Sequence, residues 1–64
     1  RIFDAVIRLP QKYRVVVHLF YYEEYSVREI AEILSLSEAN VKTRLSRSRA
    51  MLRDKLKEVW DDDE

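Results

Sequence analysis

The sequence has 64 residues with no glycine, no cysteine and a single proline, Pro10. The lack of glycine argues against strand-rich folds, because their tight turns usually place glycine at a positive φ. The lack of cysteine excludes disulfides and thiolate metal sites, which often supplement the thin core of so short a chain. Together with 38% charged residues, these absences predict an all-α domain stabilised by apolar packing.

Several function classes are also disfavoured. No apolar run approaches the roughly 18 residues of a membrane span, and the chain looks like a soluble fragment cut from a longer protein. His18 is the only histidine and has no cysteine or suitably spaced carboxylate to join it. Because there is no nucleophile–base pair or glycine-rich loop either, we expect no metal, no cofactor and no enzymatic activity.

The net charge is zero, but the charges are segregated. Residues 42–57 contain seven bases and one acid, Asp54, whereas residues 58–64 contain five acids and no base. A basic stripe of this kind is typical of a polyanion-binding surface. We therefore expect a nucleic-acid-binding domain over residues 1–60 and an acidic tail over residues 61–64. The tail either lies along the stripe and competes with phosphates or points away and aids solubility.

The pattern predicts four helices. The first spans residues 2–8, and the second runs from Pro10 to about Tyr22. Ser26 and Glu29 fit a capping box that starts a short third helix, and Ser37 is a suitable N-cap for a long fourth helix. A short helix, a corner and a long helix form a helix-turn-helix. The residues expected to line the inner side of the fourth helix are Val41, Leu45, Ser48, Leu52, Leu56 and Val59.

The second helix carries more apolar surface than one stripe requires. Tyr13, Val16, Val17 and Phe20 form a first stripe. The second stripe, formed by Val15, Leu19 and Tyr22, either packs against the first helix or is exposed as a partner-binding surface.

The side of the fourth helix opposite its apolar stripe carries small residues, flanked by Lys42 and Arg47. Residues 39–53 contain five bases and no acid, although an ordinary exposed face would mix acids with bases. Small residues let a helix enter the major groove, where Arg47 can pair with guanine N7 and O6. The alternative is a solvated basic face. The small residues are Ala39, Thr43, Ser46 and Ala50.

Other residues are assigned around Arg47. Lys42 and Thr43 are placed to reach neighbouring bases, whereas Arg44 and Arg49 better suit phosphates. Asn40 either pairs with adenine or helps to cap the helix, and Arg28 either contacts the DNA backbone or is a plain surface residue. The predicted DNA-binding set is Arg28, Ser37, Asn40, Lys42, Thr43, Arg44, Ser46, Arg47 and Arg49.

Three segments occur in order: LPQKYRVVVHL at residues 9–19, YSVREIAEIL at 25–34 and SEANVKTRLSRSRAML at 37–52. Together they resemble the C-terminal DNA-binding domain, region 4, of bacterial RNA polymerase sigma factors, and the extracytoplasmic-function group most closely. The last segment alone also resembles response-regulator helix-turn-helix domains. The element formed by Leu9, Pro10, Tyr13 and Arg14 favours the sigma family.

The resemblance implies a cytoplasmic bacterial protein that recognises the −35 element of duplex promoter DNA and docks on the flap of the polymerase β subunit. Many such domains are also sequestered by an anti-sigma factor. By motif position, the base-contacting roles fall on Lys42, Thr43, Ser46 and Arg47. The rival from another class is a helical bundle that binds polymerase or anti-sigma factor, with incidental DNA contact.

The chain departs from the family pattern at two corners, where Glu24 and Ser35 stand at positions that often hold glycine. If the backbone needs a positive φ there, each non-glycine residue costs about 1 kcal/mol.

Overall fold

The computed structural model describes the backbone of residues 2–62 and the side chains of residues 4–55. The described elements are α1 (Ile2–Ile7), α2 (Gln11–Val17), the π-helical turn η1 (His18–Tyr22), α3 (Val27–Leu34) and α4 (Glu38–Asp62). The predicted all-α fold of four helices ending in a helix-turn-helix is confirmed. No helix in this part of the chain is long and apolar enough to cross a bilayer.

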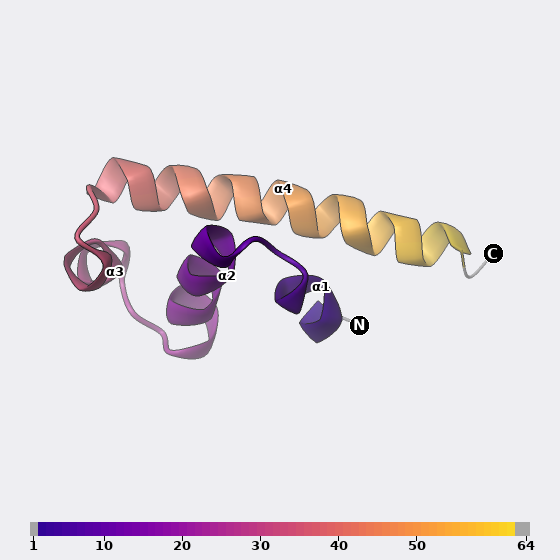
Figure 1. Ribbon diagram of the computed structural model, residues 1–64, viewed down its shortest axis with the longest axis horizontal. Coiled ribbons are helices and arrows are strands. Elements are labelled where there is room, and N and C mark those ends of the chain that lie inside the picture. Colours follow the sequence, from indigo (N-terminus) through magenta and orange to yellow (C-terminus); the bar gives the residue numbers. More distant parts are fainter. Residues whose placement is uncertain (1, 63–64) are drawn as a thin grey trace.

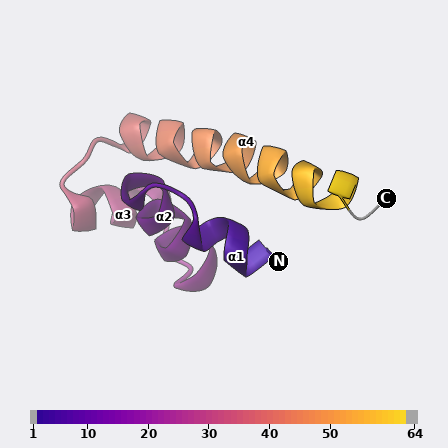
Figure 2. The same ribbon diagram turned by 45° about the vertical axis from the view of Figure 1, so that its right-hand side comes forward.

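The long helix α4 determines the shape of the molecule. At about 1.5 Å per residue, its 25 residues account for most of the 43 Å longest dimension. The other helices all lie along one side of α4, with α3 below its N-terminal end, α2 crossing further along and α1 beyond α2 (Figures 1 and 2). The opposite side of α4 is therefore left without a packing partner among the described helices.

The core consists of two clusters that α2 connects. The first core cluster joins α2, α3 and α4, and the second joins α1 and α2 to the middle of α4. Because α2 contributes to both clusters, it fixes the position of α4 at two points along its length. The buried residues of the first are Val16, Ile30, Ala31, Val41 and Leu45, and those of the second are Val6, Leu9, Tyr13 and Val17, against which Met51 and Leu52 pack.

Ser48 lies on the inner side of α4 where this helix faces α2. Its side chain is fully buried, and its hydroxyl donates to the Arg44 carbonyl at 2.6 Å and lies 3.5 Å from the Tyr13 carbonyl. A small residue with a satisfied hydroxyl permits the two helix backbones to approach closely here. The inward position predicted for Val41, Leu45 and Ser48 is thus observed, whereas the side chains of Leu56 and Val59 lie outside the described residues.

The second helix ends at about Tyr22, as predicted, but its last part is π-helical. After Val17 the chain changes to the π-helical turn η1, in which the Glu23 N–H donates to the His18 carbonyl five residues earlier, at 3.1 Å. The longer hydrogen-bonded loop changes the spacing of side chains around the helix. As a result Leu19 packs against the first core cluster while Tyr22 remains 52% exposed, although α-helical spacing assigned both to one stripe.

Both corners that lack the family's glycine adopt a positive φ. Glu24, which follows η1, has φ 60°, and Ser35, which ends α3, has φ 57° and ψ 45°. After Ser35, the Leu36 N–H donates to the Ala31 carbonyl at 2.9 Å, and the Leu36 side chain packs against the first core cluster. This is the hydrogen bond and apolar contact of a Schellman motif, in which glycine is the preferred left-handed residue.

Replacing Ser35 or Glu24 with glycine is therefore expected to stabilise the domain by up to about 1 kcal/mol each, because glycine adopts a positive φ without steric cost. Urea unfolding monitored by circular dichroism measures the change. Ala50→Gly is the matched control, since Ala50 is exposed inside α4 and glycine there should cost about 1 kcal/mol. Destabilisation by Ser35→Gly as large as that by Ala50→Gly would contradict the argument.

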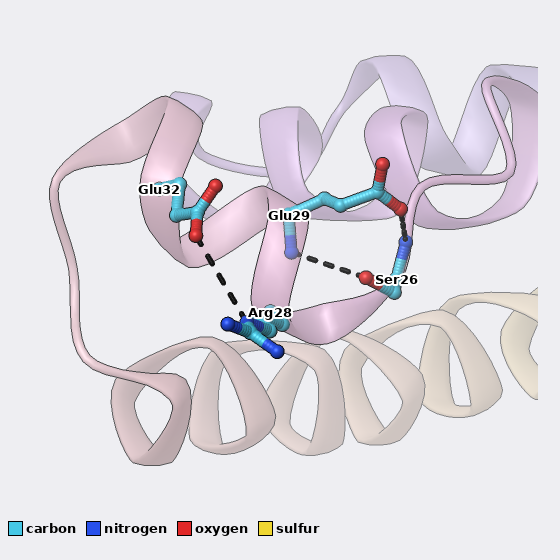
Figure 3. Close-up of polar contacts among 4 residues, drawn as sticks. All are labelled: Ser26, Arg28, Glu29 and Glu32. Carbon is cyan, nitrogen blue, oxygen red and sulfur yellow. Dashed lines mark hydrogen bonds and ion pairs between the residues drawn. The ribbon is translucent and has the colours of Figure 1, made fainter.

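The predicted capping box at the start of α3 is confirmed. The Ser26 hydroxyl accepts from the Glu29 N–H at 3.1 Å, and the Glu29 carboxylate accepts from the Ser26 N–H at 2.9 Å (Figure 3). The backbone hydrogen bond from Ser26 is the main cause that lowers the pKa of Glu29 below its ordinary 4.5.

A carboxyl with a lowered folded-state pKa stabilises the fold above its unfolded pKa, and this contribution is lost as the pH falls through the folded pKa. We expect the melting temperature of the wild type to fall more between pH 6 and pH 3 than that of Glu29→Gln, which keeps an acceptor but does not titrate. Thermal unfolding at a series of pH values gives both profiles. Parallel profiles would show that the Glu29 charge contributes nothing to stability.

Candidate nucleic-acid interface

The outer face of α4, defined by Ala39, Thr43, Ser46 and Ala50, is exposed along its length. On the opposite, inner side of α4, Val41, Leu45 and Ser48 are buried where α4 packs against α2 and α3. The side chains of Lys42 and Arg47, which flank it, are exposed as well. The fold therefore presents a small-residue helical surface with cations beside it, as the pattern predicted.

The N-terminus of α4 is capped by Ser37. Its hydroxyl accepts from the Asn40 N–H at 3.1 Å, which satisfies one of the free donors of the first turn. Asn40 takes part in this cap through its backbone, and its side chain is exposed. Ser37 thus has a structural role as the N-cap of α4, and the Asn40 side chain is exposed in the first turn of this helix.

Arg47 lies beside a tyrosine of α2. The nearby Arg47 side chain is the main cause that lowers the pKa of the Tyr13 phenol below its ordinary 10.0, and burial of the ring opposes it. Lys12 adds to the positive field, with its Nζ 5.1 Å from the centre of the Tyr13 ring. Tyr13 is a member of the second core cluster, against which Met51 and Leu52 of α4 pack, so its phenol lies beside α4.

Arg49 has a defined partner in η1. Its Nε donates to the Tyr21 hydroxyl at 2.7 Å, and its guanidinium carbon lies 5.9 Å from the centre of the Tyr21 ring. Tyr21 belongs to η1 and had not been assigned to the site from the sequence. No local pattern could have indicated the pair, because the two residues are 28 positions apart.

Two further cations of the predicted set differ in exposure. Arg44 is half-buried, and its carbonyl accepts the Ser48 hydroxyl. Arg28, in the first turn of α3, is exposed, and its Nε lies 4.0 Å from Oε1 of Glu32 one turn later (Figure 3). An exposed pair of this kind contributes little to stability, so Arg28 can exchange Glu32 for another anion at small cost.

A second surface lies between α1 and the α2–η1 segment. It is an apolar groove of about 390 Å³, and its rim includes Ile7 and Tyr22, which are 47% and 52% exposed. Of the predicted second stripe, Val15 and Tyr22 line the groove, and Val15 and Leu19 both pack against the first core cluster. The lining residues are Val6, Ile7, Gln11, Arg14, Val15, His18 and Tyr22.

Polar contacts hold the ends of this groove. The Arg14 guanidinium donates to the Ile7 carbonyl at 3.1 Å and so ties α2 to the end of α1. The His18 ring stacks on Tyr22 with 5.6 Å between ring centres, and His18 Nε2 lies 3.4 Å from Oε1 of Glu23. His18 is exposed.

The acidic tail predicted at residues 61–64 lies outside the residues whose side chains the structure describes. The backbone of α4 extends to Asp62, so the helix includes its first two residues. If the tail lies along the basic stripe and competes with phosphates, deletion of residues 61–64 should tighten DNA binding, most strongly at low salt.

Comparison with known proteins identifies the family. Residues 1–52 match the family model described as Sigma-70, region 4. The chain is 44% identical over 56 residues to the ECF RNA polymerase sigma factor SigW of Bacillus subtilis, a match that covers 88% of this chain and 30% of SigW. It is 42% identical over 53 residues to the RNA polymerase sigma factor FliA of Pseudomonas aeruginosa, covering 83% of this chain and 22% of FliA.

A third relative is the probable RNA polymerase sigma factor RfaY of Xanthomonas campestris, 40% identical over 58 residues, which are 91% of this chain and 14% of that protein. The chain thus spans less than a third of the length of each of these relatives. The matched residues include the two core clusters, the capping box and the outer face of α4. The family predicted from the sequence motifs is confirmed: the chain belongs to the sigma-70 region 4 family.

Proposed function

We propose that this domain is the promoter-recognition module of an alternative sigma factor, which places α4 in the major groove of the −35 element and docks on RNA polymerase. It binds DNA and protein and performs no chemistry of its own. The observation that carries the proposal is the exposed outer face of α4, which is small, free of acids and flanked by Lys42 and Arg47. A helix with such a face fits the major groove, which admits one α-helix.

The cations divide into two roles by position. Lys42, Thr43, Ser46 and Arg47 are exposed on or beside the outer face and are proposed to meet base edges. Arg44 and Arg49 lie on the flanks and are proposed to meet phosphates, as Arg28 is from the start of α3. Ser37 and Asn40 are proposed to contact DNA from the capped N-terminus of α4.

The names of the relatives support a role in transcription initiation. Each is an RNA polymerase sigma factor, and one belongs to the ECF group. We extend that setting to this chain: transcription initiation in the bacterial cytoplasm, with the polymerase core as partner. The family match favours this function over a response-regulator domain.

Selection of bound sites from a pool of random duplexes, followed by a salt titration of binding to the selected duplex, tests the proposal. We expect one preferred sequence and a log affinity that falls linearly with log salt, with a slope of about −0.9 per phosphate contacted. Recovery of random sequences, or an affinity that does not change with salt, would contradict DNA recognition by α4.

The apolar groove supports the second half of the proposal, docking on the flexible flap of the polymerase β subunit. Its exposed rim residues Ile7 and Tyr22, together with Val15, suit the apolar side of a partner helix. An anti-sigma factor that uses the same groove would compete with polymerase. Binding of a purified flap fragment to the wild type and to Tyr22→Asp measures the contribution of the groove.

A further inference from the structure

The contact between Tyr21 and Arg49 joins the end of the α2–η1 segment to a flank of the recognition helix. Arg49 Nε donates to the Tyr21 hydroxyl at 2.7 Å, and the guanidinium carbon lies 5.9 Å from the ring centre. Both side chains reach solvent, since Arg49 is exposed and Tyr21 is 49% exposed. The contact between the two side chains is therefore not part of the hydrophobic core.

We propose that Tyr21 is a positioning residue for DNA binding: it holds the Arg49 guanidinium on the flank of α4 before DNA arrives, so that the free N–H groups of that guanidinium are presented to a backbone phosphate. This inference rests on the proposed function, because it assigns a device to the same DNA-binding surface. It adds a residue of η1 to a site that the sequence assigned to α3, α4 and the corner between them.

The donor inventory of arginine permits both contacts at once. A guanidinium carries five N–H donors in a fixed plane, and the contact with Tyr21 uses the one on Nε. The four donors on the terminal nitrogens remain for a phosphate, which arginine binds in a bidentate manner. A long side chain that is ordered beforehand loses less conformational freedom when it binds.

The chemistry of the partner matters as much as its position. Tyr21 offers a neutral hydroxyl and a ring face, so it orients Arg49 without cancelling its positive charge. A carboxylate in the same place would hold the guanidinium but would also repel an approaching phosphate. Arg28 has a partner of this second kind, because its guanidinium lies beside the carboxylate of Glu32.

The position of the Tyr21 ring is itself determined by the core. Phe20 packs against the first core cluster, and the Phe20 and Tyr21 rings meet edge to face with 5.0 Å between their centres and 85° between their planes. Arg49 thus contacts Tyr21, Tyr21 contacts Phe20, and Phe20 packs against the first core cluster. Such a chain of contacts can hold an exposed side chain in one orientation.

The test is a double-mutant cycle with Tyr21→Phe and Arg49→Ala, measured on the duplex recovered by site selection and on one random-sequence duplex. Tyr21→Phe removes the hydroxyl and keeps the ring. We expect it to weaken binding about threefold to tenfold on both duplexes, and to have no further effect when Arg49 is already alanine. Tyr22→Phe is the matched control, because the adjacent Tyr22 ring stacks on His18 and lines the apolar groove instead.

A second measurement does not require DNA. The ¹H–¹⁵N signal of the Arg49 Nε–H group should be protected from solvent exchange in the wild type and lose that protection in Tyr21→Phe, at an unchanged melting temperature. An equal loss of affinity with and without Arg49, wild-type binding by Tyr21→Phe, or an unchanged Nε–H signal would each overturn the positioning role alone. A wild-type domain that binds neither duplex would overturn the proposed function and the positioning role together.

Discussion

Replacement of Arg47 with alanine is expected to weaken binding to the selected duplex by about 1–3 kcal/mol and to relax the preference at one or two base pairs. The side chain is exposed beside the outer face of α4, where an arginine can pair with both acceptors of a guanine. The Arg47 side chain lies near the phenol of Tyr13, a member of the second core cluster. The effect should therefore depend on sequence.

Binding assays with the selected duplex and with single-base variants of it measure this effect. Arg49→Ala is the control: it should weaken binding to all sequences alike and reduce the salt slope by about one unit, as expected for a lost phosphate contact. The melting temperature of Arg47→Ala should match that of the wild type, since the exposed side chain contributes no core packing. Equal losses on every duplex for both variants would refute the division into base and phosphate contacts.

Leu19→Asp is expected to remove most of the stability of the domain. Leu19 packs against the first core cluster, where α2, α3 and α4 meet, and a carboxylate there would lie among apolar side chains. The loss of packing together with the desolvated charge should cost about 2–4 kcal/mol. A single core in a chain of this size supplies only about 3–5 kcal/mol, so the substitution removes most of the stability. Circular dichroism and urea unfolding give the result.

The matched variant is Tyr22→Asp, three residues along the same segment. Tyr22 is 52% exposed at the rim of the apolar groove, so the variant should remain folded and lose binding to the polymerase flap fragment. The two variants separate the two explanations that the sequence left open for the second stripe. A folded Leu19→Asp domain that has lost only partner binding would place Leu19 in the interface and not in the core.

Much of the architecture follows from local sequence. Pro10 ends one helix and starts the next, Ser26 and Glu29 form a capping box, and Ser37 caps α4, because each of these effects acts within about one turn. The outer face of α4 could also be predicted, since α-helical spacing separates its small residues from its buried ones. The corners at Glu24 and Ser35 were identified through the family's glycines, and both have a positive φ.

Tertiary structure decided what lies beside that face. The pairing of Arg49 with Tyr21 and the proximity of Arg47 to Tyr13 arise only because α2 packs across α4, and no pattern along one helix specifies where two helices cross. The change from α-helix to π-helix at His18 likewise redirected the side chains that follow, so that Leu19 packs against the first core cluster and Tyr22 remains exposed. Helix ends and helix faces are set by neighbours in sequence, whereas the partners of an exposed arginine are set by neighbours in space. The sequence alone therefore determined which helix carries the cations, and the fold determined which tyrosines lie beside them.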